Sequence, residues 1–261
     1  MTSADAASAG QVSVTEDAFL GGRLRLLQPR AAYRAGLDAV LLAAAVDAGA
    51  GQRALDVGAG VGTVGLCLAV RTGADVVLLE QEPELTALAA ENVKRNVLTD
   101  RVRVACGRVG LGEREAAALG LAAESFDHVL ANPPYHDRAR GTAAADPVKA
   151  GSHAMPAADL ESWVRFMARM AAPGGTATMI HKAQALPPVL AAFASRFGAL
   201  RVLPVHPRSG APANRILVQG VKGSRAPLVL LRAFVVHGPE QAFRPEAEAI
   251  LRHGSALALA G

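Results

Sequence analysis

The chain has 261 residues, 51% of them hydrophobic, and carries a formal net charge of +4 at pH 7. Its longest purely apolar run, Ala39–Val46, is far shorter than the ~20 residues that a membrane-spanning helix needs. The first residues are small and polar, without the basic start and apolar stretch of a secretory signal. We therefore expect a cytoplasmic protein with no membrane partner.

The two cysteines, Cys67 and Cys106, lie in a predicted helix and a predicted strand, outside any Cys-x-x-C or Cys/His cluster. This spacing is typical of buried, reduced thiols in a cytoplasmic protein. It offers no ligand set for a structural zinc ion, and we expect no metal.

Basic residues are concentrated in the second half of the chain. No Asp or Glu lies between Ser162 and Pro239, whereas ten cations do: Arg165, Arg169, Lys182, Arg196, Arg201, Arg208, Arg215, Lys222, Arg225 and Arg232. Segregation of this kind is typical of a protein that binds a polyanion. The alternative is that these arginines are scattered over the surface without a shared ligand.

Residues 1–13 are predicted to be disordered, and a β-hairpin and a helix follow. In the hairpin, Gly21-Gly22 supplies the turn between strands at Ala18–Leu20 and Arg23–Leu26. The helix spans Leu37–Val46, with Asp38 near its start and glycines after its end. We expect one domain over residues 14–261, with the hairpin and helix in 14–52 and the core in 53–261.

From Ala54, short apolar runs alternate with helical stretches. The predicted strands are Ala54–Val57, Val76–Glu80, Val102–Cys106, Phe126–Ala131 and Thr176–Ile180. The predicted helices between them are Val61–Arg71, Pro83–Asn96, Arg114–Ala122 and Ala157–Ala171. Alternation predicts an α/β fold with a parallel sheet and helices on both faces. The later elements are a helix at Leu186–Arg196, strands at Leu200–Val205, Ile216–Gly220 and Leu228–Val236, and a helix at Pro245–Arg252.

The first core strand runs directly into a glycine-rich turn. Asp56 is followed by Gly58-Ala59-Gly60 and then by Gly62 at the start of a helix. Glycine permits the sharp bend and the close approach of a ligand to the backbone. Glu80 ends the next strand, where a carboxylate can accept hydrogen bonds from both hydroxyls of a ribose. This G-x-G-x-G spacing suits an adenosyl amino acid better than a dinucleotide, because it leaves no place for a pyrophosphate.

The tetrad Asn132-Pro133-Pro134-Tyr135 follows the strand Phe126–Ala131. An exocyclic amine or an amide is a poor nucleophile, because its lone pair is delocalised. Two acceptors that bind its two N–H groups would free that lone pair; the Asn132 side chain and the rigid Pro133 carbonyl can supply them. Tyr135 can stack on a flat substrate. A target base would have to be unpaired or flipped out.

With these two motifs, the chain resembles the class I amino methyltransferases, which act on adenine N6, guanine N2 or glutamine side chains. Over its whole length it is most similar to the bacterial tRNA (adenine-N6) methyltransferases, which modify the adenosine 3′ of the anticodon in a valine tRNA. The further matches are Gln28–Arg30, Tyr33–Ala43, Ala131–His136, Pro207–Gly210, Asn214-Arg215 and Gly220–Arg225.

The resemblance implies a Rossmann-like fold with a seven-stranded, mostly parallel sheet, and S-adenosylmethionine as cofactor. It implies cofactor contacts at Tyr33, Arg34, Asp38, Asp56, Gly58, Ala59, Gly60, Gly62, Glu80, Gln81, Gly107, Arg108 and Asn132. It also implies that tRNA phosphates contact Arg208, Arg215, Lys222 and Arg225, which we expect on one continuous face. Arg108 departs from the acidic residue usual in the family near the adenine.

Other functions are compatible with the tetrad. A glutamine-N5 protein methyltransferase would need a helical domain ahead of the glycine turn, where about fifty residues beginning with a hairpin stand instead. A DNA adenine methyltransferase would need an added target-recognition region. Another RNA methyltransferase, acting on adenine N6 or guanine N2 of rRNA, uses the same chemistry. A non-enzymatic RNA-binding module would not need Asn132 or the glycines, which are intact.

Overall fold

The structure is a computed structural model that describes residues 13–30, 35–134 and 157–259. Its strands are β1 (Val14–Phe19), β2 (Leu24–Pro29), β3 (Arg53–Val57), β4 (Asp75–Glu80), β5 (Val102–Cys106), β6 (Phe126–Ala131), β7 (Ala171–Lys182), β8 (Phe197–Arg208), β9 (Arg215–Lys222), β10 (Val229–Leu230) and β11 (Phe234–His237). Its α-helices are α1 (Leu37–Ala44), α2 (Thr63–Thr72), α3 (Pro83–Arg95), α4 (Glu113–Ala118), α6 (Ala157–Met170), α7 (Leu186–Ala194) and α8 (Pro245–His253). The predicted alternation of strands and helices is confirmed in these ranges.

The main sheet of the described residues has the order β10-β8-β9-β7-β6-β3-β4-β5, with β11 also paired to β8. Strands β3 to β7 are parallel, and β9 runs antiparallel to both β7 and β8. This is the mostly parallel, Rossmann-like sheet that was predicted, with β10 and β11 added beyond the seven core strands. Strand order reverses between β3 and β6, the kind of position at which open α/β sheets bind ligands.

One predicted strand, Leu228–Val236, is wrong as a single element. The chain pairs Leu230 with Val202 and then Phe234 with Val205, so one extra residue interrupts the ladder. An extra residue of this kind bends a strand and reverses the faces of the side chains that follow. Both residues of β10, Val229 and Leu230, are exposed, whereas Phe234 of β11 is buried.

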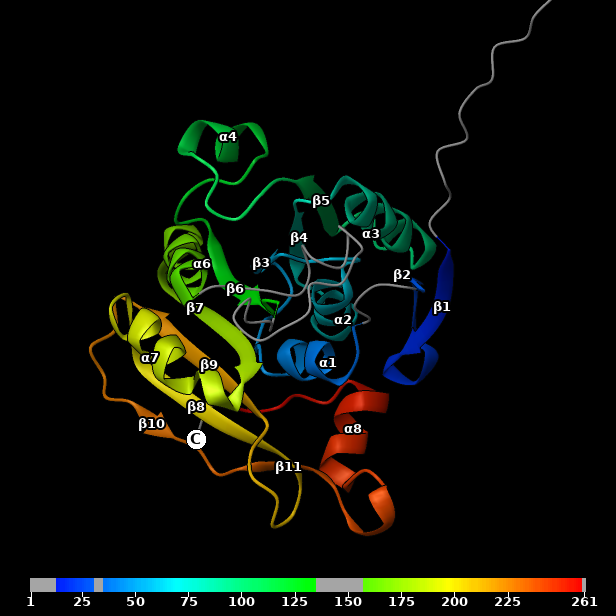
Figure 1. Ribbon diagram of the computed structural model, residues 1–261. Helices are drawn as coiled ribbons and strands as arrows, with labels where there is room; N and C mark the ends of the chain where they lie inside the picture. The colour runs from blue at the N-terminus through cyan, green and yellow to red at the C-terminus, as the bar shows by residue number, and fades with distance from the viewer. Residues whose placement is uncertain (1–12, 31–34, 135–156, 260–261) are drawn as a thin grey trace, which may run out of the picture.

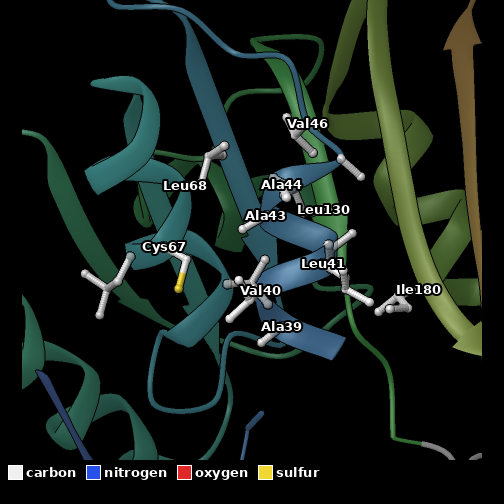
Figure 2. Packing of buried hydrophobic residues seen from close by; sticks show 14 of the residues in the cluster. Ala39, Val40, Leu41, Ala43, Ala44, Val46, Cys67, Leu68, Leu130 and Ile180 are labelled. Atoms are coloured by element: carbon white, nitrogen blue, oxygen red, sulfur yellow. The ribbon is translucent and has the colours of Figure 1, made fainter. Parts of the chain in front are cut away.

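Helices cover both faces of the sheet (Figure 1). One core cluster joins α1, α2 and α8 to the sheet, and a second joins α6 and α7 to the opposite face. The apolar run Ala39–Val46 is buried in the first cluster, where its small side chains let α1 approach Cys67 and Leu68 of α2 (Figure 2). Among the described residues, no helix has the length and apolar character to cross a membrane.

The N-terminal hairpin is confirmed as the antiparallel pair β1 and β2. Ser13, predicted to be disordered, accepts a hydrogen bond of 2.8 Å from the Arg30 amide and so continues the pairing of the hairpin. The rest of the predicted disordered segment, residues 1–12, lies outside the described part of the chain.

Both cysteines are free, as expected, but only Cys67 is buried. Cys106 is exposed because it is the last residue of β5, which is the outermost strand of the sheet.

Candidate active site

The carboxyl ends of the parallel strands bring the predicted site residues to one edge of the sheet. In the strand registers, Glu80 pairs with Cys106, and Val57 pairs with Leu79 on one side and Ala131 on the other. Gly58 therefore follows β3 between Glu80 of β4 and Asn132 after β6. Neighbouring strands lie about 4.8 Å apart, so the glycine turn and the tetrad flank the point where strand order reverses.

The glycine turn, residues Gly58–Gly62, is fixed by backbone hydrogen bonds. The amides of Gly58 and Ala59 both donate to the Leu79 carbonyl, at 2.8 and 2.9 Å. Gly58, Gly60 and Gly62 have φ of 68°, 56° and 91°, a region that glycine adopts without strain. A β-carbon on Gly60 would meet nothing within 4 Å, so the space in front of this residue is open to a ligand.

Gly58 has a second reason to be glycine. A β-carbon at this position would lie 2.4 Å from Cη2 of Trp163 on α6. The indole therefore lies directly against the turn, and α6 covers one side of the candidate cofactor site.

The Glu80 carboxylate is buried and points at the glycine turn. Its Oε2 accepts from the Gly60 amide at 2.7 Å, and its Oε1 accepts from the amides of Gln81 and Glu82 at 2.8 and 2.9 Å. A carboxylate has about four acceptor sites, so these three bonds leave capacity for a ligand hydroxyl. The position fits the ribose of an adenosyl cofactor.

Asp56 is held inside the fold rather than at the open edge. Its Oδ2 accepts from the Gly65 amide of α2 at 2.8 Å, and only 1% of the residue is exposed. Burial, opposed by the Gly65 hydrogen bond and assisted by the nearby Glu80 carboxylate, raises the pKa of this carboxyl to about 7. The hydrogen bond from Gly65 to Asp56 joins β3 to α2, the helix that follows the glycine turn.

The residues expected around the adenine follow β4 and β5. The Gly107 amide donates to the Glu80 carbonyl at 2.8 Å, which keeps the two strand ends together. The exposed Gln81 amide group lies 3.3 Å from Glu82. Arg108 is exposed and lies 3.8 Å from the Glu115 carboxylate, so its guanidinium is drawn towards α4.

Asn132 and Pro133 follow β6 directly, and Pro133 is buried while Asn132 and Pro134 are partly buried. The fourth residue of the tetrad, Tyr135, lies outside the described residues, as do Tyr33 and Arg34.

Asp38 and Arg215, predicted to contact different ligands, contact each other. The Arg215 Nε donates to Asp38 Oδ2 at 2.8 Å, and both side chains are largely buried. The pair joins the first turn of α1 to the first residue of β9. It lines a pocket of about 330 Å³ at the same edge of the sheet as the tetrad.

The expectation of one continuous basic face is wrong. β9 begins beside the end of β7, where Arg215 pairs with Lys182, and it ends beside the start of β8, where Lys222 pairs with Phe197. At ~3.4 Å per residue, Arg215 and Lys222 are separated by roughly 24 Å along the strand. Arg208 and Arg215 therefore lie where the parallel strands have their carboxyl ends, which we call the tetrad edge. Lys222 and Arg225 lie at the other ends of the strands, the opposite edge.

Lys222 is also engaged within the protein. Its Nζ donates to Glu124 Oε1 at 2.8 Å and to the carbonyls of Ala168 and Ala171 at 2.7 and 2.8 Å. No pattern in the sequence indicates this role, because Glu124 lies ahead of the acid-free stretch.

Two polar residues that support the site were missed in the sequence. Asn92 on α3 is fully buried; it exchanges hydrogen bonds with the Leu27 backbone and donates to the Val61 carbonyl of the turn at 3.1 Å. Gln28 is equally buried and holds the backbone of Ala35 ahead of α1. The available signal for Asn92 was a polar residue on the apolar face of an amphipathic helix.

His181 was missed as well. It lies near the end of β7, two residues after Met179, which pairs with Ala131 of β6. Burial, together with Lys182 and Arg215, lowers the pKa of His181 to about 4, although the hydrogen bond from the Lys182 amide raises it. The imidazole beside the tetrad is therefore neutral at pH 7.

Within the described ranges, no group of three or more His, Cys, Asp or Glu side chains is arranged to hold a metal ion. The candidate site is thus built from backbone amides, one buried carboxylate and the Asn-Pro-Pro segment.

Sequence comparison matches residues 34–153 to the methyltransferase small domain family. A relative from Bacteroides fragilis (strain YCH46), tRNA1(Val) (adenine(37)-N6)-methyltransferase, is 35% identical over 106 residues, which are 41% of this chain and 43% of the relative. The match to this curated relative thus spans less than half of its length.

Solved structures extend the comparison over the whole fold. Atu636 from Agrobacterium tumefaciens, described as a predicted O-methyltransferase, is 31% identical and aligns with a TM-score of 0.71 over 85% of this chain and 98% of its own. P. horikoshii TYW2, crystallised with MeSAdo, aligns with a TM-score of 0.55 at 14% identity, over 82% of this chain and 74% of its own. At that identity the second likeness shows the fold alone.

Proposed function

We propose that this chain, which belongs to the class I S-adenosylmethionine-dependent methyltransferases, transfers a methyl group to N6 of an adenosine in the anticodon loop of a tRNA. The observation that carries the proposal is the placement of Asn132-Pro133-Pro134 directly after β6, next to the glycine turn at the reversal of strand order. A methyl donor held by the turn and an amine held by the Asn-Pro-Pro segment would meet at this point.

The proposed cofactor contacts come from residues that follow the carboxyl ends of the parallel strands. Glu80 would accept hydrogen bonds from the ribose hydroxyls, and Gly58–Gly60 would lie against the amino acid part, where the space in front of Gly60 is open. When bound, S-adenosylmethionine supplies an electrophilic methyl group on a sulfonium sulfur. Gln81, Gly107 and Arg108 would surround the adenine, and Asp38 the methionine end.

Asn132 and Pro133 would activate the acceptor nitrogen. The Asn132 side-chain carbonyl and the Pro133 backbone carbonyl would accept its two N–H groups and draw it towards tetrahedral geometry, which frees the lone pair to attack the methyl carbon. The buried Pro133 fixes its carbonyl, since a proline restricts the backbone. Such acceptors contribute most where water is excluded and where charge develops in the transition state.

The site favours a nitrogen over an oxygen acceptor. A hydroxyl carries one hydrogen and needs a base, whereas two neighbouring acceptors match the two hydrogens of an amine. His181 lies close to the tetrad, but a pKa near 4 makes its imidazole a weak base.

The tRNA substrate is supported by the name of the Bacteroides relative and by Arg208 and Arg215 at the tetrad edge. Phosphate contacts from arginines position a nucleic acid without reading its sequence. The opposite placement of Lys222 and Arg225 restricts this proposed contact surface to one edge of the sheet.

The decisive experiment is transfer of a tritiated methyl group to total tRNA from cells that lack this modification. The expected result is label in tRNA, recovered as N6-methyladenosine after complete nuclease digestion, with the initial rate about 10²–10³-fold lower for an Asn132→Ala variant. Label in rRNA, or label recovered as N2-methylguanosine, would assign another RNA substrate and leave the methylation of an amine unchanged. Label in protein, recovered as N5-methylglutamine, would overturn the RNA assignment.

A further inference from the structure

A pair of stacked aromatic rings, one of them exposed, lies at the far end of the tetrad edge. The rings of His237, the last residue of β11, and Phe243 are stacked at 4.9 Å between centroids with planes 21° apart. Backbone pairing between the same two residues holds them together, and the Gly238 amide donates to the Ala242 carbonyl at 2.9 Å. Phe243 remains 39% exposed, so one large ring stands at the surface on a rigid support.

An exposed cation lies beside this pair. Arg208, at the end of β8, pairs in register with His237 of β11. Its side chain is exposed and takes part in no hydrogen bond or ion pair with the other described residues. This distinguishes it from Arg215, which is tied to Asp38, and from Lys222, which is tied to Glu124.

A pocket lies next to His237, between the start of α1 and the ends of β8 and β11. It has a volume of about 330 Å³, and its polar lining includes Asp38, Asn214, Arg215 and His237. Pockets for small ligands begin at about this size. Arg215 lines this pocket, and its guanidinium carries donors that suit the phosphate of a nucleotide.

We propose that Phe243, His237, Arg208 and this pocket form a second nucleotide subsite, which binds a nucleotide of single-stranded RNA that is not the one methylated. The base stacks on the Phe243 ring, and a neighbouring phosphate contacts Arg208. The inference rests on the proposed function, because it requires an RNA substrate. Stacking on an aromatic ring accepts any base, so the subsite holds the strand without reading it.

The distance along the edge sets which nucleotide is bound. From β6 to β11 the sheet runs β6, β7, β9, β8, β11, which is four strand spacings or roughly 19 Å. That separation exceeds a single nucleotide. The subsite therefore holds the strand some positions away from the target while the target adenosine occupies the tetrad.

The test measures binding of a fluorescein-labelled RNA hairpin, with an adenosine in its single-stranded loop, by fluorescence anisotropy. Phe243→Ala should weaken the affinity roughly 5- to 150-fold, the range given by removing one base–aromatic stack. Phe243→Tyr should restore it. Arg208→Gln should lower the slope of log affinity against log salt by about one unit, as for one lost phosphate contact.

Arg225→Gln is the matched control, because this arginine is also exposed but lies at the opposite edge. It should change neither affinity nor salt slope. S-adenosylhomocysteine affinity, measured by calorimetry, should be unchanged in every variant. A Phe243→Ala variant that also loses cofactor affinity would show a structural role and overturn the subsite.

The subsite and the proposed function fail in different ways. If the wild-type protein binds and methylates RNA but Phe243→Ala binds the hairpin as tightly, the subsite is wrong and the function stands. If the wild-type protein neither binds the hairpin nor methylates tRNA, the proposed function is wrong and the subsite falls with it.

Discussion

The indole of Trp163 lies so close to Gly58 that a β-carbon on residue 58 would stand 2.4 Å from its Cη2 atom. Trp163 is also the only tryptophan of the chain. The glycine turn and helix α6 are thus in direct contact, and the fluorescence of this indole is sensitive to changes in either.

Gly58→Ala should therefore destabilise the fold and weaken binding of S-adenosylhomocysteine. The new methyl group displaces Trp163, and residue 58 must keep its positive φ of 68°, which together should cost roughly 2–4 kcal/mol. Thermal unfolding followed by tryptophan fluorescence measures the first effect, and calorimetry with S-adenosylhomocysteine measures the second.

Gly223→Ala is the matched control for backbone strain. Gly223 has φ of 80°, but a β-carbon there would meet nothing within 4 Å, and it lies after β9 at the opposite edge. It should cost about 1 kcal/mol and leave cofactor affinity intact. Equal losses of cofactor affinity in both variants would remove the Trp163 contact from the explanation.

The sequence predicted where those parts of the candidate site lie that depend on local pattern. Gly58–Gly62 and Asn132-Pro133-Pro134 are located by their strands, and parallel strands bring their carboxyl ends to one edge. The sequence could not predict pairings that depend on strand direction. Lys222 and Arg225 were expected beside Arg215, but β9 carries them to the other edge, because an antiparallel strand reverses which end faces the site.

The contacts that single residues make with distant parts of the chain could not be predicted from the sequence either. Asp38 lies 177 positions from Arg215, and each was expected to contact a different ligand; only the packing of α1 against the start of β9 brings them together. Asn92 appeared to be one polar residue among many on α3, although it joins the hairpin to the glycine turn.

Glu80→Ala should weaken binding of S-adenosylhomocysteine by roughly 1.5–3 kcal/mol, the value of hydrogen bonds to a charged group. Because Glu80 also accepts from the Gly60 amide, part of this loss could come from a disturbed turn. The two causes separate when the titration is repeated with the 2′,3′-dideoxyribose analogue. The penalty should largely vanish with that analogue, and an equal penalty for both ligands would contradict the ribose contact.

Asp56→Asn should change how stability depends on pH. The pKa of Asp56 is raised to about 7 in the folded protein, from near 4 when unfolded, so the folded state binds the extra proton between these values. Its contribution to stability is then greatest below pH 4, falls as pH rises towards 7 and is constant above that. The loss is on the order of 4 kcal/mol.

The measurement is the difference in unfolding free energy between wild type and Asp56→Asn, from urea denaturation at several pH values. The asparagine can still accept from the Gly65 amide but does not titrate. The variant should gain stability relative to wild type as pH rises from 4 to 7. A difference that stays flat over this window would show that Asp56 titrates at its ordinary pKa.

Asn132→Ala should abolish most methyl transfer and leave cofactor binding nearly intact. The side-chain carbonyl matters mainly as charge develops on the attacking nitrogen, so its loss affects the transition state more than the ground state. Removal of one such electrostatic contact should lower the rate by about 10²–10³. Single-turnover transfer with saturating tRNA measures this step apart from binding and product release.

Calorimetry with S-adenosylhomocysteine and the thermal midpoint serve as controls, and both should match wild type. A variant that keeps a near wild-type single-turnover rate would remove Asn132 from the mechanism. A variant whose rate falls only in proportion to its cofactor affinity would make Asn132 a cofactor contact, and the activation of the amine would then have to come from elsewhere.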